Sequence, residues 1–319
     1  MNTIYFPGLG IGPFTVNEIA FKLPFLKDHR GIAWYGIIIT LGIILAVTYV
    51  MMHSKREGIK NDDVLDLAIF LIPGAVIGAR LYYVIFYGGY NTFLDIIAFW
   101  NGGLAIYGGI IAGALIVVAV SLFKKIKPLK MLDLIAPALL IGQAIGRWGN
   151  FVNAEAFGRE TDVLWRMGIL TDGMTKMKYY HPTFLYESLW NVLGLVILIL
   201  LYRKKKYDGQ ILFGYIAWYG FGRMLIEGLR TDSLYWGTIR ISQLIGFVSF
   251  VVGTILFIAF LIISKKKRLI AESYELQYSN EEKIISVEED NDIDISTNNS
   301  VTDSEICDEE KGEENGKNN

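Results

Sequence analysis

Residues 146–151, Gly-Arg-Trp-Gly-Asn-Phe, place a guanidinium and an amide at the end of an apolar stretch. A charged side chain inside a bilayer costs at least about 2.5 kcal/mol, so such an arginine is expected to face a bundle interior and to have a function. Arg147 and Asn150 are three residues apart and share one helix face. The guanidinium fork suits phosphate or carboxylate oxygens, so an anionic ligand and a structural ion pair are equally open.

A second set of polar residues lies in a later apolar window. Spacings of four, four and three residues put its members on one helical stripe: Tyr219, Arg223, Glu227 and Arg230. The structural alternative is an ion pair between Arg223 and Glu227, because either charge alone would be costly. Arg230 has the alternative role of a lipid-headgroup anchor. Arg80, in an earlier window, is a second-rank candidate whose long side chain can also reach the membrane surface.

The composition indicates a helical membrane protein. The chain has 319 residues, of which 53% are hydrophobic, and its mean hydropathy is +0.38. A transmembrane helix needs about 20 apolar residues. Seven windows come close to that length: 32–52, 64–87, 103–123, 131–149, 182–202, 210–227 and 240–263. We therefore predict an all-α, polytopic membrane protein with seven transmembrane helices.

The basic residues predict the orientation of these helices. Four basic clusters fall on alternate connections, at 55–60, 124–130, 203–206 and 265–268. Connections rich in lysine and arginine stay in the cytoplasm, which predicts an outside N-terminus and a cytoplasmic C-terminus. The irregular, glycine-rich connections then lie outside. An active site is expected to face outward with them.

Three segments follow from these patterns. We expect an extracytoplasmic N-terminal segment at 1–31, a membrane domain at 32–268 and an acidic tail at 269–319. Half of the 32 acidic residues fall in 271–319, beside three lysines. Such a polar, charged segment is predicted to be disordered. Residues 1–270, by contrast, carry 27 basic against 16 acidic residues.

No metal or organic cofactor is expected. The single cysteine, Cys307, excludes disulfides and paired-cysteine metal sites within the chain. The three histidines lack the spacing of metal ligands. The sequence also has no nucleotide-binding loop, dinucleotide fingerprint or nucleophile elbow, and no nucleic-acid partner is expected.

Five motifs occur in order along residues 30–246. They are Trp34-Tyr35-Gly36; the glycine-rich stretch 102–109; 146–151 with Asn153, Glu155 and Gly158; His181-Pro182-Thr183 before Tyr186-Glu187; and Tyr219 to Arg223 with Glu227 and Arg230. Each motif alone is a weak signal. Together they resemble the bacterial prolipoprotein diacylglyceryl transferases.

The resemblance implies a seven-span plasma-membrane enzyme with an extracytoplasmic active site. It would move the diacylglyceryl group of phosphatidylglycerol to the lipobox cysteine of a prolipoprotein signal peptide and release glycerol phosphate. The implied catalytic residues are Arg147, Arg223, Tyr107 and Glu227. The implied lipid-binding residues are Arg147, Asn150, Arg223, Tyr35, Tyr219, Gly103, Gly108, Gly158, Arg80 and Arg230.

One position departs from the family pattern. Many members carry histidine in a His-Gly-Gly motif where this chain has Tyr107, and that histidine has been assigned the role of general base. A phenol is a poor base at neutral pH. We therefore expect Arg147 and Arg223 to hold the phosphate and to favour the substrate thiolate. Tyr107 would orient a reactant, while Glu227 or a phosphate oxygen receives the proton.

Two other functions remain open at the level of sequence. Intramembrane arginines also suit a transporter for a small anion or lipid, which would need a polar path to both membrane faces. A structural subunit of a membrane assembly would explain the glycine-rich packing. It would not explain two arginine clusters near one face.

Overall fold

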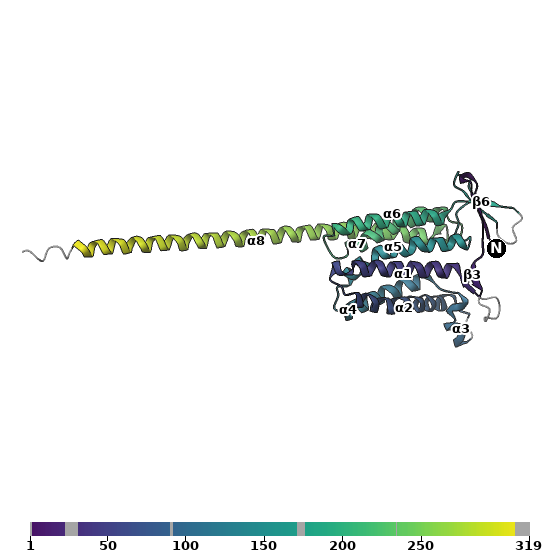
Figure 1. Ribbon diagram of the computed structural model, residues 1–319, viewed down its shortest axis with the longest axis horizontal. Coiled ribbons are helices and arrows are strands. Elements are labelled where there is room, and N and C mark those ends of the chain that lie inside the picture. The colour runs from purple at the N-terminus through teal and green to yellow at the C-terminus, as the bar shows by residue number, and fades with distance from the viewer. Residues whose placement is uncertain (1, 23–30, 90–91, 171–175, 234, 310–319) are drawn as a thin grey trace, which may run out of the picture. The chain divides into compact units, whose positions relative to one another are not determined.

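The computed structural model describes residues 2–22, 31–89, 92–170, 176–233 and 235–309. The chain divides into two compact units, Met1–Leu261 and Ile262–Asn319. The first unit holds the helices α1 to α7, the short strands and the beginning of α8 (Figure 1).

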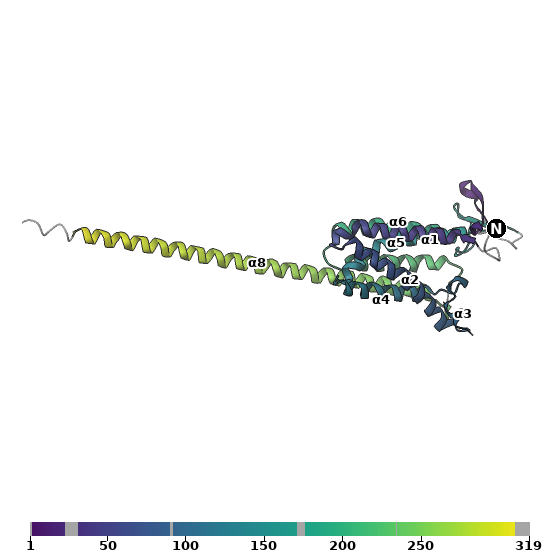
Figure 2. The same cartoon turned by 60° about the horizontal axis from the view of Figure 1, so that its bottom comes forward.

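Six helices in the described residues are long and apolar enough to cross a membrane. They are α1 (Trp34–Ser54), α2 (Asn61–Tyr87), α4 (Ile106–Phe123), α5 (Pro128–Val152), α6 (Thr183–Arg203) and α8 (Ile241–Glu309). The remaining predicted window, 210–227, corresponds to α7 (Gln210–Ile226), which has 17 residues. The chain is thus a polytopic helical protein of the kind that the composition predicts. α1, α2, α4, α5 and α6 run alongside one another in the first unit (Figure 2).

Short strands correct the prediction of a purely α-helical chain. A four-stranded antiparallel sheet has the order β2 (Ile11–Val16), β1 (Asn2–Phe6), β5 (Met167–Leu170), β6 (Lys178–Tyr180). Two smaller ladders pair β3 (Ile19–Lys22) with β4 (Gly31–Ala33) and β7 (Tyr235–Trp236) with β8 (Ile239–Arg240). The strands β3 and β6 lie with the short helix α3 (Phe93–Ile97) at one end of the helices (Figure 1).

The sheet forms because β1 alternates buried and half-buried residues. Ile4 is fully buried and Phe6 nearly so, and both pack with Ile169, Met167 and Phe184 in one apolar cluster. This alternation has the two-residue period of a half-buried strand. The N-terminal segment is thereby fixed to the connection between α5 and α6.

Close packing joins the helices in pairs. α2 and α4 meet at glycines, since a Cβ built on Gly108 would lie 2.3 Å from the carbonyl oxygen of Gly78. α6 and α7 meet at stacked indoles, with the Trp190 and Trp218 centroids 4.3 Å apart. Each indole N–H donates to the backbone carbonyl of the other tryptophan, at 3.2 and 3.1 Å. Small residues at such contacts let membrane helices approach closely.

A buried carboxylate fixes the start of α7. Asp133 of α5 is fully buried and accepts hydrogen bonds from the backbone N–H groups of Gly209, Ile211 and Leu212, at 2.7 to 2.9 Å. Lys205 Nζ lies 3.0 Å from the same carboxylate. An anion at a helix N-terminus satisfies unpaired N–H groups and complements the helix dipole.

The acidic tail begins within α8. The composition predicts disorder for this tail, whereas in the structure the helix continues to Glu309. No proline or glycine interrupts residues 269–309. Residues 310–319 lie outside the described part of the chain.

Candidate active site

The two predicted arginine clusters form one cluster. Arg147 lies near the C-terminal end of α5, Arg223 near the C-terminal end of α7, and Glu227 starts the short helix η4 (Glu227–Leu229) that follows α7. Because α5 and α7 run side by side into the same end of the bundle, their polar ends meet there. Arg230 caps η4 and joins them.

Glu187, in the second turn of α6, connects three arginines. Its Oε2 lies 2.5 Å from Arg147 Nη2 and 3.3 Å from Arg223 Nη1, and its Oε1 lies 3.1 Å from Arg230 Nη1. Only 5% of Glu187 is exposed. The site predicted from sequence omits this side chain. An acidic residue inside an apolar window is the signal that could have identified it.

Glu227 forms the second carboxylate of the cluster. Its Oε2 lies 2.5 Å from Arg223 Nη2, as the structural alternative of an intrahelical ion pair predicts. Its backbone carbonyl accepts a hydrogen bond from Arg240 Nη1. Glu227 is 2% exposed, so its carboxylate is buried beside Arg223.

Arg230 also contacts Asp232 beyond the end of η4. The Nε and Nη2 atoms donate to the two carboxylate oxygens of Asp232, at 2.9 and 2.6 Å. Burial opposes the charge of both groups, but their mutual contact raises the pKa of Arg230 and lowers the pKa of Asp232. The pair is therefore ionised at neutral pH.

Arg147 also faces a cavity of about 510 Å³ between α1, α2 and α5. The lining is apolar along most of its length, with residues such as Val50, Leu67 and Leu139. Four residues with polar groups gather toward one end: Tyr35, Gln143, Arg147 and Asn150. The cavity therefore has the amphipathic character of a lipid.

Two amides extend the polar end of the cavity. Asn150 Oδ1 accepts from Arg147 Nη1 at 3.3 Å, and Asn150 Nδ2 donates to Glu155 at 2.9 Å. Gln143 Nε2 donates to the hydroxyl of Tyr215 at 2.8 Å. Gln143 Oε1 is buried and accepts no hydrogen bond within the described residues. Gln143 lies one turn before Arg147 in the sequence, and the predicted site does not include it.

Two of the three predicted tyrosines, Tyr35 and Tyr219, lie around this polar end. Tyr35 lines the cavity, and its ring fills the space beside Gly149, where a Cβ would lie 2.6 Å from it. Tyr219 stacks on Tyr215 with ring centroids 5.8 Å apart. Tyr219 thus packs against Tyr215, whose hydroxyl accepts the hydrogen bond from Gln143.

Arg80 lies elsewhere and binds backbone rather than the cluster. Its guanidinium donates to the carbonyl oxygens of Asp95, Ile96, Gly102 and Gly103, at 2.6 to 2.9 Å. Arg80 is 8% exposed. These contacts hold the connection that leads into α4.

The three predicted glycines have packing roles in the structure. Gly103 has a φ of +71°, and a Cβ there would lie 2.6 Å from Arg80 Nη1. Gly108 provides the contact of α4 with α2 described above. Gly158 forms a β-bridge with Arg230 and would contact His181 if it carried a side chain. Each glycine therefore permits a close packing contact through its lack of a Cβ.

Comparison with known proteins identifies the family. The model of the prolipoprotein diacylglyceryl transferase family matches residues 19–259. The chain belongs to this family. A phosphatidylglycerol–prolipoprotein diacylglyceryl transferase of Streptococcus mutans is 44% identical over 252 residues, covering 76% of this chain and 95% of that protein. A protein of the same name from Streptococcus pyogenes serotype M1 is 45% identical over 246 residues, covering 75% of this chain and 93% of that protein.

In this diacylglyceryl transferase family member, Tyr107 lies in the first turn of α4 and is half-buried. Its neighbour Ile106 lines the cavity. No hydrogen bond or ion pair between described residues joins Tyr107 to the arginine cluster. The orienting role predicted for Tyr107 stays a prediction. Among the described residues, no group of histidine, cysteine, aspartate or glutamate side chains is arranged to hold a metal ion.

Proposed function

We propose that the protein transfers the diacylglyceryl group of phosphatidylglycerol to the lipobox cysteine of a prolipoprotein. The observation that carries this proposal is the apolar cavity that ends at Arg147 and Asn150. The names of the relatives support the same reaction. Arg147, Arg223 and Arg230 with Glu187 and Glu227 form what we call the arginine–glutamate cluster. The transporter alternative is not favoured, because this cluster lies at one end of α5, α6 and α7.

The cavity supplies a place for each part of the lipid. The apolar walls from α1, α2 and α5 receive acyl chains, and the polar end receives the phosphate and glycerol headgroup. The buried, unpaired oxygen of Gln143 accepts a hydrogen bond from a headgroup hydroxyl. A buried acceptor left without a partner costs about 1–3 kcal/mol, so this contact favours a headgroup that carries a hydroxyl.

The phosphate takes over arginine contacts that the carboxylates make in the empty site. Arg147 turns one guanidinium edge from Glu187 to the phosphate oxygens, and Arg223 reaches the same group. Charge then develops on the phosphate oxygens as the carbon–oxygen bond breaks. Fixed cations in a site shielded from water stabilise the charge that develops in the transition state more than they stabilise the phosphate charge of the bound lipid.

Bond making and proton transfer balance within this site. The substrate thiolate forms the carbon–sulfur bond with the glycerol carbon, and the electron pair of the broken carbon–oxygen bond leaves with glycerol phosphate. Glu187, released from Arg147, receives the thiol proton. Its direct contact with the cavity-lining arginine favours Glu187 over the two acceptors expected from sequence, Glu227 and a phosphate oxygen. Tyr107 orients the reactants from α4.

We further propose seven membrane spans with the N-terminus and the active site outside the plasma membrane. With 17 residues, α7 is about 25 Å long, close to the roughly 30 Å of hydrocarbon. Three of the basic clusters, at 55–60, 124–130 and 203–206, fall at the opposite end of the first unit from the arginine–glutamate cluster, on the side that the positive-inside bias makes cytoplasmic. Phosphatidylglycerol and the signal peptide then both enter from the membrane.

The direct test uses purified full-length protein, phosphatidylglycerol and a lipobox peptide. We expect the mass of one diacylglyceryl group to appear on the peptide, with equimolar release of glycerol phosphate. A peptide with serine in place of cysteine is the matched control and should stay unmodified. An unmodified cysteine peptide, together with anion flux through the protein in liposomes, would instead support the transporter.

A further inference from the structure

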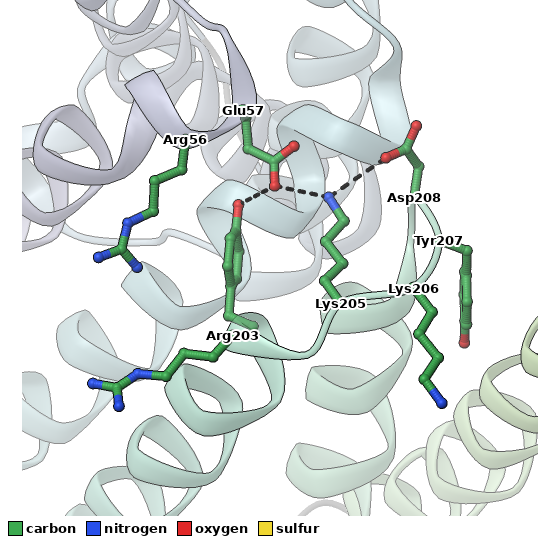
Figure 3. A pocket seen from close by; sticks show the side chains of 8 residues that line it. Arg56, Glu57, Arg203, Lys205, Lys206, Tyr207 and Asp208 are labelled. Atoms are coloured by element: carbon green, nitrogen blue, oxygen red, sulfur yellow. Dashed lines mark hydrogen bonds and ion pairs between the residues drawn. The ribbon is translucent and has the colours of Figure 1, made fainter.

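A second cavity lies at the other end of the bundle from the arginine–glutamate cluster. It has a volume of about 680 Å³ and lies between η2 (Lys55–Glu57), the end of α6 and the connection from α6 to α7 (Figure 3). Four of its lining residues are basic and two are acidic. The proposed transfer reaction uses none of them.

The two acidic residues of this cavity are already paired with cations. Glu57 Oε1 accepts hydrogen bonds from the Tyr202 hydroxyl at 2.6 Å and from Lys205 Nζ at 2.9 Å. Lys205 also lies 3.5 Å from Asp208, and Lys130 lies 3.7 Å from Glu57 Oε2. These contacts neutralise the carboxylates.

Two arginines of the cavity have no such partner in the part of the chain that the structure describes. Among the described residues, neither Arg56 nor Arg203 forms an ion pair with a carboxylate, and both are exposed. Figure 3 shows their side chains pointing to the same side of the cavity, away from the dashed contacts of Glu57 and Lys205. Arg56 follows the end of α1 and Arg203 ends α6, so both lie where membrane-spanning helices reach the lipid headgroups.

We propose that Arg56 and Arg203 bind a phosphate group in this cavity, carried by an anionic phospholipid or by a soluble phosphate. The formal charge of the lining is +2, which a phosphate neutralises in part or in full. Guanidinium groups bind phosphate oxygens through paired, charge-assisted hydrogen bonds. Basic pockets between membrane helices near the headgroups are a known setting for anionic lipids.

The test counts lipids bound to the full-length protein in detergent by native mass spectrometry. The probe is a phosphatidic acid, whose headgroup is a bare phosphate. We expect Arg56→Gln with Arg203→Gln to weaken binding at one site by about tenfold or more, because two charge-assisted contacts are lost. The arginines of the transferase site are unchanged, so the difference reports this cavity alone.

The matched control removes the two neighbouring charges with Lys55→Gln and Lys204→Gln. Both lysines are exposed, and neither lines the cavity. This variant should bind the lipid as the wild type does. Equal binding by the arginine variant, or equal loss in both variants, would overturn the proposal.

Two further arms complete the experiment. Displacement of the lipid from this site by millimolar inorganic phosphate identifies a soluble phosphate as a ligand, and its failure to displace identifies the lipid. Arg56→Lys with Arg203→Lys keeps both charges and the fold but removes the guanidinium forks. Unweakened binding in this variant would overturn the assignment to arginine. Peptide lipidation should continue in every variant, so failure here and failure of the transferase proposal are distinguishable.

Discussion

Glu187 contacts three arginines from three different parts of the chain: Arg147, Arg223 and Arg230. Together with Glu227 and Asp232, it gives the cluster as many carboxylates as these arginines. A buried charge without a partner is strongly destabilising, whereas a paired one is tolerated. The empty site is therefore stable, and an entering phosphate exchanges one anionic partner of the arginines for another.

The first prediction concerns Glu187→Gln. The variant removes the proposed proton acceptor and frees Arg147 from its carboxylate. We expect the rate of peptide lipidation to fall by about a hundredfold, the usual contribution of a general base, while phosphatidylglycerol binds at least as tightly. Single-turnover lipidation and equilibrium lipid binding measure the two effects separately.

Glu160→Gln is the matched control for this variant. Glu160 is exposed and pairs with Lys178, outside the arginine cluster. Its replacement should leave both quantities unchanged. A wild-type rate of peptide lipidation in Glu187→Gln would refute its role as proton acceptor. If the rate fell only in Glu227→Gln, Glu227 would be the proton acceptor.

The second prediction concerns the buried oxygen of Gln143. Gln143→Leu keeps the approximate shape of the side chain and removes its acceptor. Phosphatidylglycerol and phosphatidic acid are compared as competitors for the lipid site. The ratio of their inhibition constants should change by about tenfold in favour of phosphatidic acid. This is the contribution of one hydrogen bond between uncharged groups, with the cost of leaving its buried acceptor unpaired. An unchanged ratio of the two inhibition constants would show that the headgroup hydroxyl binds elsewhere.

At the scale of elements, glycine contacts set the distance between α2 and α4. Gly108→Ala would place a methyl group 2.3 Å from the backbone of α2, and backbone cannot move aside as a flexible side chain does. We expect a loss of about 1–3 kcal/mol in the free energy of unfolding, measured by thermal unfolding in detergent. Gly113→Ala in the same helix is the control, since its nearest neighbour is the end of Leu71 at 3.4 Å. Equal losses in both variants would contradict this account of the packing.

The helices were predictable from the sequence because an apolar run of about 20 residues has the length of a membrane-spanning helix. The window 131–149 became α5 at Pro128–Val152, and the window 182–202 became α6 at Thr183–Arg203. The sheet was not predictable, because its strands have three to six residues and its partners β1 and β5 are far apart in the chain. Short strands depend on distant pairing more than on local pattern.

The site was predictable where residues recur at helical spacing and less so elsewhere. Arg223 and Glu227 are one turn apart, and their contact follows from that spacing. Glu187 reaches Arg147 and Arg230 only through the packing of α6, which no local spacing encodes. Arg80 was expected near a ligand because it is a charge in an apolar window. Backbone carbonyls of the connection before α4 accept hydrogen bonds from it, a contact that no local spacing encodes, and its role in lipid binding stays a prediction.

At the scale of the whole molecule, the orientation in the membrane can be tested with single cysteines. Cys307→Ser gives a chain without cysteine, because Cys307 is the only one. Leu9→Cys lies in an exposed turn beside the sheet, and Lys60→Cys lies in the basic connection before α2. In intact cells, a membrane-impermeant maleimide should label position 9 at once and position 60 only after the cells are permeabilised. The reverse pattern would invert the proposed orientation.

The stacked pair of Trp190 and Trp218 has a practical consequence. Trp190 follows Glu187 by three residues on α6, and Trp218 precedes Arg223 by five on α7. Each indole N–H is fixed on the opposite helix, so any movement that parts α6 from α7 breaks both hydrogen bonds together. A chain that retains this pair as its only tryptophans would carry an intrinsic fluorescent probe, whose emission follows the opening of the two helices without an added dye.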